Sequence, residues 1–519
     1  MYLKFIFLMF INLIIILDTI IYKLVLLINM SRKYLSKSTF ITGLQCPKAL
    51  YFKKYKPELA DEINLAKQNV FDVGNEVGLL AQKLFPGGID ASPEHYTKLA
   101  ESISYTSDLI NDGVDVIYEA GFEYDYVRCF IDILVKKNGK WHIYEVKSST
   151  KVSETYINDA SLQYYILKNC GLDVESVSIV HINNSYIKNR ELDVFNFFSI
   201  TPVLEKIQNK IDFVPIKLKE LHEVLLENET PEIDIGKQCT KPYECDFKSY
   251  CWKDVPDYSV LNISRLKPDT KWGLYNSGYI NIKDVPLDTK MSSNQRIQVD
   301  CEINQTNLFN KKKIKEFLDG LTNDVFHLDF ETVGVAIPIF DGLKPYQPNP
   351  FQYSLHHEKN GKIIKHYEFL ASSEEDSREL FIKSLIKDLQ CSGDILVYNI
   401  GFERGRLKEL IRSFPKYESD IQEIIDRMKD LMIPFKEKWY YVPEMQGSYS
   451  IKKVLPALVP DLTYKDLSIN KGDVASLEFS NLNKKSLQEQ ENIRKDLLEY
   501  CKMDTFAMFK ILEVLRKKI

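Results

Sequence analysis

The chain has no excess of positive charge, and this absence limits how it can bind nucleic acid. Its 519 residues include 68 Lys and Arg against 73 Asp and Glu, a formal net charge of −5. Nucleic-acid binding would therefore have to come from local basic patches. The sequence also lacks an evident internal repeat or a long low-complexity tract. With 45% hydrophobic and 27% charged residues it has a globular composition, and its length predicts two or three domains.

Long apolar runs are absent after residue 29, whereas the first 29 residues consist largely of one. Only Asp18 and Lys23 interrupt its central part. An acid near the bilayer centre costs about 3 kcal/mol, which the surrounding Ile, Leu and Phe could offset, so a membrane anchor is one interpretation. We favour the alternative, a cytoplasmic protein translated from Met30, because composition changes abruptly there. No small-residue cleavage site follows, which argues against a removable signal peptide.

The nine cysteines do not suggest a disulfide framework, because the chain is long and lacks an evident secretory cleavage site. Three of them, Cys239, Cys245 and Cys251, are spaced by five residues in GKQCTKPYECDFKSYCW. A cluster that needs four thiolates would have to recruit Cys46, far upstream in TGLQCPKALYFKKY, and four thiolates suit either an iron–sulfur cluster or tetrahedral Zn²⁺. The others are expected to be buried core thiols, namely Cys129, Cys170, Cys301, Cys391 and Cys501.

The segment CFIDILVKKNGKWHIYEVKSST predicts a β-hairpin that carries two acids. Apolar residues flank Asp132, Asn138-Gly139 suits a two-residue turn, and WHIYEVKSS alternates like a second strand. Asp132 and Glu145 are therefore expected side by side, where two carboxylates favour Mg²⁺ or Mn²⁺. Lys147 would share a face with Glu145 and could orient a water or stabilise a phosphorane. A solvated surface hairpin is the alternative.

A second acidic pattern occupies the C-terminal half. In DVFHLDFETVG, Asp329 and Glu331 share one face of a predicted strand. DILVYNIGFERGRLKELI predicts a buried strand and then a helix that carries Glu403. In LLEYCKMDTFAMFKIL, Tyr500 and Asp504 are four residues apart on one face of an amphipathic helix. Each motif alone occurs by chance, but their order over about 180 residues favours a metal site.

The first pattern resembles the PD-(D/E)XK nucleases, and its cysteines resemble those of the iron–sulfur RecB-type members. This resemblance implies a [4Fe–4S] cluster on the four cysteines already named, although relatives often have a shorter first gap, and Zn²⁺ is the alternative. Glu76, in FDVGNEVGLLAQKLF, would be a metal-associated acid, and Gln163-Tyr164-Tyr165 would match a helix that follows the Glu-x-Lys strand. A charge favoured by the helix dipole and plain core packing are the alternatives for these residues.

The second pattern resembles the DnaQ-like, or DEDD, exonucleases of ribonuclease H fold. This resemblance implies two metal ions roughly 4 Å apart, with Asp329, Glu331 and Asp504 among their ligands. Tyr500 would orient the attacking water, as in the tyrosine subclass. Glu403 departs from the family, which usually has Asp there, and Asp430 is the next candidate for the fourth acid.

From about Lys33 onward the chain resembles domain-of-unknown-function family 2779, and the resemblance lies in segments such as HLDFET, GSYSIKKVLPALVPDLTY and YCKMDT. We expect an α/β protein with a PD-(D/E)XK-like nuclease domain at 31–260 and a DnaQ-like exonuclease domain at 321–519. Residues 261–320 would form a helical linker, which faintly resembles a helix-hairpin-helix. The expected function is metal-dependent hydrolysis of DNA, with RNA possible, in repair, recombination or defence. A nucleic-acid-binding scaffold with inactive sites is the alternative.

Overall fold

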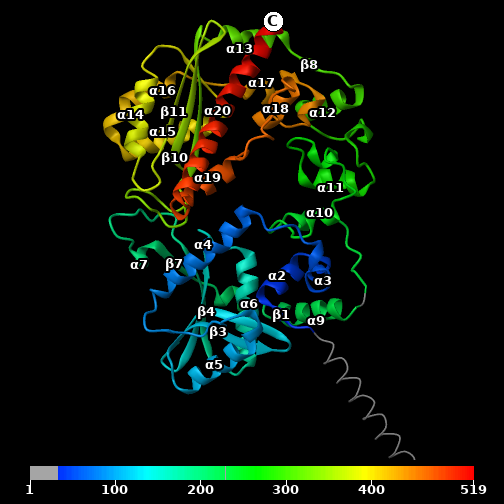
Figure 1. Ribbon diagram of the computed structural model, residues 1–519. Coiled ribbons are helices and arrows are strands. Elements are labelled where there is room, and N and C mark those ends of the chain that lie inside the picture. Colours follow the sequence, from blue (N-terminus) through cyan, green and yellow to red (C-terminus); the bar gives the residue numbers. More distant parts are fainter. Residues whose placement is uncertain (1–32, 228) are drawn as a thin grey trace, which may run out of the picture. The chain divides into compact units, whose positions relative to one another are not determined.

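The computed structural model describes residues 33–227 and 229–519, which form two compact units (Figure 1). The first unit contains residues 33–62, 73–183 and 193–253, and the second contains 63–72, 184–192 and 254–519. The segment expected to be an anchor or a mis-assigned start, residues 1–29, lies outside the described residues. Among the described residues, the helices are all too short or too polar to cross a membrane.

The first unit is built on one seven-stranded mixed sheet. Its strand order is β2-β3-β4-β5-β6-β7, and β1 pairs with the start of β4. The strands are β1 (Leu35–Ser36), β2 (Ile89–Asp90), β3 (Val116–Tyr124), β4 (Val127–Lys137), β5 (Lys140–Lys147), β6 (Val174–Ile182) and β7 (Phe198–Pro202). The pairs β3–β4, β4–β5 and β6–β7 are antiparallel, whereas β1–β4, β2–β3 and β5–β6 are parallel.

The predicted hairpin between β4 and β5 is confirmed. Lys137 pairs with Lys140, and the two residues between them, Asn138 and Gly139, have φ values of 52° and 81°. Positive φ at both central positions is the requirement of the tight hairpin turn that Asn-Gly favours. The turn therefore fixes the register that brings the two acidic strands together.

Nine helices of the described first unit surround this sheet. They are α2 (Lys37–Gln45), α3 (Pro47–Tyr55), α4 (Leu65–Gln82, whose first residues belong to the second unit), α5 (Leu99–Asn111), α6 (Glu154–Asn169), α7 (Val194–Phe197), α8 (Leu204–Gln208), α9 (Phe213–Leu226) and α10 (Lys248–Cys251). Apolar residues of β3 to β6 pack with α6 and α9 into one core, which includes Ile143, Leu162 and Leu218.

The second unit is built on a five-stranded mixed sheet with the order β11-β10-β9-β12-β13. These strands are β9 (Asp324–Val333), β10 (Asn349–Lys359), β11 (Lys362–Leu370), β12 (Asp394–Val397) and β13 (Met428–Asp430), and a separate pair joins β8 (Leu308–Phe309) to β14 (Tyr440–Tyr441). The central strand β9 is antiparallel to β10 and parallel to β12.

Helices cover both faces of this second sheet, as Figure 1 shows with α14 to α16 on one side and α20 on the other. The helices are α11 (Pro268–Asn276), α12 (Ser293–Asn304), α13 (Lys311–Asp319), α14 (Arg378–Asp388), α15 (Ile400–Ser413), α16 (Glu418–Asp426), α17 (Ile433–Lys436), α18 (Ile451–Leu458), α19 (Gly472–Ser480) and α20 (Leu487–Lys517). Residues 261–320, expected to be a linker, form α11, α12, α13 and β8 of this unit.

The alternation predicted for β9 is confirmed by its packing. Phe326, Leu328 and Phe330 pack against α14, α15 and α16, whereas Val325 and Val333 pack with the core that contains α20. Because successive side chains of a strand point to opposite faces, Asp329 and Glu331 lie on the α20 side. A predominantly apolar strand thus presents two carboxylates toward one helix.

The prediction of buried core thiols is correct for three of five cysteines. Cys129, Cys301 and Cys501 are buried, but Cys170 and Cys391 are exposed. Cys170 is the C-cap of α6, and Cys391 lies in the loop between α14 and β12. Apolar neighbours in sequence did not predict burial there because both residues lie just beyond the end of a helix.

Candidate functional sites

The first candidate site is an acidic cavity of about 610 Å³ at the sheet of the first unit. Asp132 on β4 and Glu145 on β5 line it together with Asp90 and Glu119. Ile133 of β4 pairs with Tyr144 of β5, so their neighbours Asp132 and Glu145 lie side by side on the two strands. The backbone N–H of Val146 donates to Asp132 Oδ2 at 2.6 Å and fixes this carboxylate.

Glu145 is almost completely buried, with 1% of its surface exposed, and it is held by three nitrogen donors. Lys147 Nζ lies 2.6 Å from Glu145 Oε1, which confirms that these side chains share one face. The same ammonium lies 2.8 Å from Asp159 Oδ2 on α6. Gln163, also on α6, donates to Glu145 Oε2 at 2.7 Å, so the predicted glutamine belongs to this site. Tyr164 and Tyr165 of the same segment instead pack with the core.

Lys37 supplies the third donor and was not anticipated from the sequence. Its Nζ lies 2.9 and 3.0 Å from the two oxygens of Glu145 and 3.5 Å from Asp132 Oδ1. It is the first residue of α2, and Ser36 caps this helix through a reciprocal pair of bonds with Thr39. The cap therefore holds the lysine at the carboxylates.

Glu119 is a further acid of this cavity that sequence patterns did not single out. Strand pairing runs Tyr118 to Ile133 and Ala120 to Ile131, so Glu119 lies on the same rung as Asp132. Burial, and then the charges of Asp132 and Glu145, raise the pKa of Glu119 to about 7. Glu76 is exposed on α4 and does not line the cavity, whereas its neighbour Asn75 does. The structure therefore places Glu119, and not Glu76, beside the two central acids.

The second candidate site lies between β9, α15 and α20. Ligand oxygens of Asp329, Glu331 and Asp504 all lie within 4.8 Å of one another, and among the described residues only these form such a group. Glu331 and Asp504 are 8% and 6% exposed. The cavity here has a volume of about 210 Å³, and Glu403 and Tyr500 also line it. All five residues predicted for this site are thus brought together.

The carboxylates of the second site repel one another. Burial raises the pKa of Glu331 to about 8, with a further contribution from Asp504, and burial raises the pKa of Glu403 to about 8. The pKa of Asp329 is also raised well above its usual range by burial, Asp504 and Glu331. A divalent cation would relieve this repulsion, and a site that offers only oxygen ligands suits Mg²⁺ or Mn²⁺.

Glu403 is placed as a metal ligand would be, whereas the carboxylate of Asp430 is already occupied by hydrogen bonds. Glu403 is 2% exposed, and within the described part of the chain its buried Oε2 has no hydrogen-bond partner. Asp430 accepts hydrogen bonds from the backbone N–H groups of Asn399, Ile400 and Met432 at 2.9 to 3.3 Å. Asp430 therefore fixes the start of α15 and does not line the cavity.

Two further side chains of the second site were not predicted from the sequence. Lys452 on α18 lines the cavity, and Tyr464 donates to Asp504 Oδ1 at 2.7 Å. Both lie in GSYSIKKVLPALVPDLTY, a segment that carried only a family resemblance at the sequence level. The only feature of the sequence that could have indicated them is a basic and an aromatic residue in a largely apolar segment. Such a pattern does not predict which acid these side chains contact.

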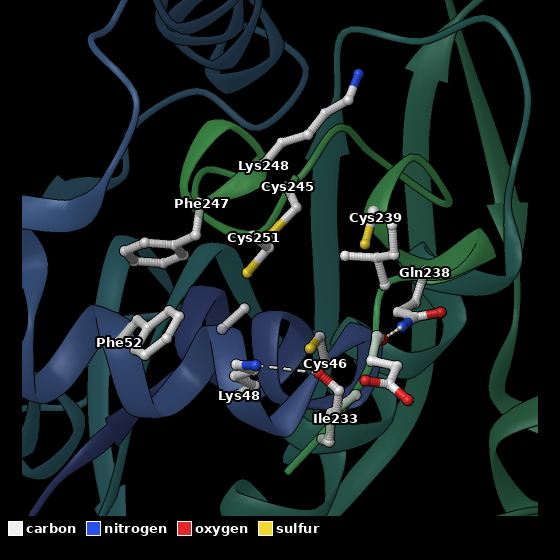
Figure 2. Close-up of a pocket in the computed structure, with 13 residues that line it drawn as sticks. Cys46, Lys48, Phe52, Ile233, Gln238, Cys239, Cys245, Phe247, Lys248 and Cys251 are labelled. Atoms are coloured by element: carbon white, nitrogen blue, oxygen red, sulfur yellow. Dashed lines mark hydrogen bonds between the residues drawn. The ribbon is translucent and has the colours of Figure 1, made fainter. Parts of the chain in front are cut away.

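The third candidate site is a small pocket that all four predicted cysteines line. Cys46 is the N-cap of α3, whereas Cys239, Cys245 and Cys251 come from the segment that ends in α10. Figure 2 shows the four sulfur atoms around a common space, bordered by Phe52 and Phe247. The sequence prediction that distant Cys46 joins the other three is supported by this geometry.

Backbone N–H groups face several of these sulfur atoms. The N–H of Gly236 donates to Cys239 Sγ at 3.5 Å. Burial raises the pKa of Cys245 to about 11 and also raises the pKa of Cys46, while the backbone amide of Phe247, and those of Ala49 and Lys48, oppose these increases. Such amides stabilise thiolates, so the donor set fits a metal centre that binds deprotonated cysteine.

The comparisons with known proteins identify relatives of this chain without assigning an activity. The family described as "Domain of unknown function (DUF2779)" matches residues 326–450, which include most of β9, all of β10 to β14, and the acids Asp329, Glu331 and Glu403. "Uncharacterized protein UU173" of Ureaplasma parvum is 28% identical over 278 residues, 47% of this chain and 40% of that protein. "Uncharacterized protein MG366 homolog" of Mycoplasma pneumoniae is 28% identical over 222 residues, 38% and 33% of the two chains. The chain therefore covers well under half of each relative.

Proposed function

We propose that this protein is a metal-dependent nuclease with two active sites, one in each unit. The observation that carries the proposal is that each unit gathers buried acids and at least one lysine in a single cavity, although the residues come from distant segments. This combination suits hydrolysis of a phosphodiester, because carboxylates can hold a cation and an ammonium can face a phosphate. DNA is the proposed substrate, and RNA is the alternative.

In the first unit, Asp132 and Glu145 are the proposed metal ligands, with a PD-(D/E)XK-like arrangement. A bound Mg²⁺ or Mn²⁺ would activate water and stabilise charge on the phosphate. Lys147 contacts Glu145 and can donate to the attacking water or to a phosphate oxygen. Gln163 and Asp159 hold these two side chains in place from α6.

In the second unit, Asp329, Glu331, Glu403 and Asp504 are the proposed metal ligands of a DnaQ-like site. The three acids with oxygens within 4.8 Å and the unpartnered Glu403 oxygen fit oxygen-binding divalent cations. Tyr500 lines the same cavity and can orient a water through its hydroxyl. This chemistry would remove nucleotides from a 3′ end.

For the cysteine pocket we propose an iron–sulfur cluster, with Zn²⁺ as the alternative. In a tetrahedral Zn²⁺ site with bonds near 2.3 Å, the sulfur atoms lie about 3.8 Å apart. Four thiolates that line one pocket also suit a cluster in which each binds a different iron.

Single substitutions in the two sites would test the proposal. Glu145→Ala should abolish one metal-dependent activity and Asp329→Ala the other, because each loss removes a carboxylate that holds the cation. The assay uses single- and double-stranded DNA and RNA, with 5′ and 3′ ends labelled separately. Exposed acids provide matched controls, Glu76→Ala for the first unit and Asp319→Ala for the second.

The outcomes separate this proposal from a binding scaffold. A protein that binds the labelled strands but degrades none of them with Mg²⁺ or Mn²⁺ would be a scaffold. If degradation occurs but persists unchanged in Asp329→Ala, the second site is not catalytic.

A further inference from the structure

Lys37 places a second ammonium group at the acids of the first unit. Its side chain contacts both oxygens of Glu145 and the nearer oxygen of Asp132. Lys147 also contacts Glu145 Oε1 and reaches Asp159. The two acids that the sequence predicted are therefore already bridged by one cation of the chain itself.

The position of Lys37 is fixed by rigid elements on both sides. Strand β1 ends at Ser36 and pairs with β4, the strand that carries Asp132. Helix α2 then runs from Lys37 to Gln45, and its C-cap is Cys46 of the cysteine pocket. Gln45 also donates to the backbone carbonyl oxygens of Gln238 and Tyr243 at 2.6 and 2.8 Å. The ammonium is thus anchored at the acids and is not a mobile surface charge.

The two sites differ in their balance of acids and lysines. In the first unit, four buried or half-buried acids face two lysines, and the acids are Glu119, Asp132, Glu145 and Asp159. Asp90 also lines this cavity, but it is exposed and its carboxylate bonds to Ser92. In the second unit, four acids face one lysine among the described residues that line the cavity, and these are Asp329, Glu331, Glu403, Asp504 and Lys452. Ionised, the first group carries a charge of about −2 and the second about −3.

We propose that Lys37 serves as a built-in second cation, which limits the first site to one divalent metal ion. This inference rests on the proposed nuclease function of the first site and defines its metal stoichiometry. One divalent ion neutralises the first group, and a second would be repelled by the ammonium that already bridges Asp132 and Glu145. Replacement of Lys37 by a neutral residue gives the first site the charge balance of the second.

The test counts metal ions and does not depend on activity. All samples are the full chain with Asp329→Ala and Asp504→Ala, which silence the second site and relieve its mutual repulsion. Equilibrium dialysis against Mn²⁺, with metal analysis, should give one ion for this parent. Lys37→Gln should bind two ions. Lys37→Arg, which keeps the charge, should bind one ion like the parent.

Matched variants keep the result interpretable. Lys54→Gln removes a half-buried lysine that donates to the carbonyl of Tyr34 outside the cavity, and it should behave as the parent. Lys37→Met retains the aliphatic stem and should reproduce the Gln variant, and circular dichroism verifies that each variant is folded.

Two results would overturn the inference in different ways. If Lys37→Gln and Lys37→Met bind one Mn²⁺, while Glu145→Ala loses binding, Lys37 does not set the stoichiometry although the metal site is real. If Glu145→Ala leaves Mn²⁺ binding unchanged, the first site holds no catalytic metal, and the proposed function of this unit fails together with the inference.

Discussion

The ammonium group of Lys452 lies 3.0 Å from the hydroxyl oxygen of Tyr500, and it also donates to the backbone carbonyl of Asn470 at 2.9 Å. Lys452 belongs to α18 and Tyr500 to α20, so this contact ties two helices together at the second acidic cavity. The tyrosine is 3% exposed and packs in the core of the second unit, and this lysine is one of the partners of its hydroxyl group. Lysine and tyrosine are expected to act as one unit.

Lys452→Met should lower the rate of the second activity by about a hundredfold, as loss of one positioned donor does in other enzymes. Because the two residues act together, adding Lys452→Met to Tyr500→Phe should cost little more than either change alone. Rates of 3′-end removal for the two single variants and the double variant provide the measurement. Lys453→Met changes the exposed neighbouring lysine and serves as the control. Strictly additive losses would show that the contact has no role in catalysis.

Glu403→Gln should lower the same rate by about a hundredfold, because it keeps the size of the side chain but removes a charged ligand. Glu403→Asp should retain more activity than the Gln variant, since the charge remains and only the reach is shorter. Initial rates at saturating Mg²⁺ compare the three proteins. A Gln variant as active as the parent would mean that Glu403 is only a charge in the first turn of α15.

Asp430→Asn should mainly affect stability. Three backbone N–H groups at the start of α15 and after β13 donate to this carboxylate. Weakening such charge-assisted bonds costs about 1–3 kcal/mol of the free energy of unfolding. Urea unfolding should show this loss, while the affinity for Mn²⁺ remains that of the parent. Unchanged stability with lost metal binding would instead identify Asp430 as the ligand.

The second site should make stability depend on pH when no metal is bound. Glu331 and Glu403 have pKa values of about 8 in the folded protein, whereas 4.5 is usual for an exposed glutamate. The folded protein therefore holds more protons than the unfolded chain, and the stabilisation present below about pH 4.5 is lost as the pH rises toward about 8.

Calorimetry in EDTA should accordingly show a melting temperature for the second unit that falls between about pH 5 and 8. Glu403→Gln should flatten this fall because the amide does not ionise. Excess Mg²⁺ should raise the melting temperature most at the upper end of this range, where the folded carboxylates are free to bind it. A Mg²⁺ effect that is largest at pH 5 would contradict the proposed ligands.

Anaerobically purified protein should be brown, since four thiolates around iron absorb visible light and Zn²⁺ does not. Cys245→Ala should bleach this colour and destabilise the first unit. Cys391→Ala, which changes an exposed cysteine away from the pocket, should keep it. Absorption spectra with iron and zinc analysis provide the measurement. A colourless protein with stoichiometric zinc would assign the pocket to zinc.

The sequence predicted the elements that follow a local pattern. The Asn138-Gly139 hairpin, the alternation of β9 and the placement of Tyr500 and Asp504 on α20 all agree with the structure. These features depend on residues a few positions apart, where strand and helix periods decide which side chains share a face. Cys170 and Cys391 show the limit of that argument, because burial at the end of a helix depends on what packs there.

Only the tertiary structure decided which cations face which acids. Lys37 meets Glu145 across 108 residues of sequence, and Lys452 meets Tyr500 across 48. Strand pairing likewise decided that the acid beside Asp132 is Glu119 and not Glu76, which the sequence had suggested. A lysine has a long flexible stem, so its position along the chain does not fix where its ammonium lies. Strand and helix periodicity in the sequence determined which acids share a face. The packing of the chain determined their cationic partners, because electrostatic contacts depend on distance in space.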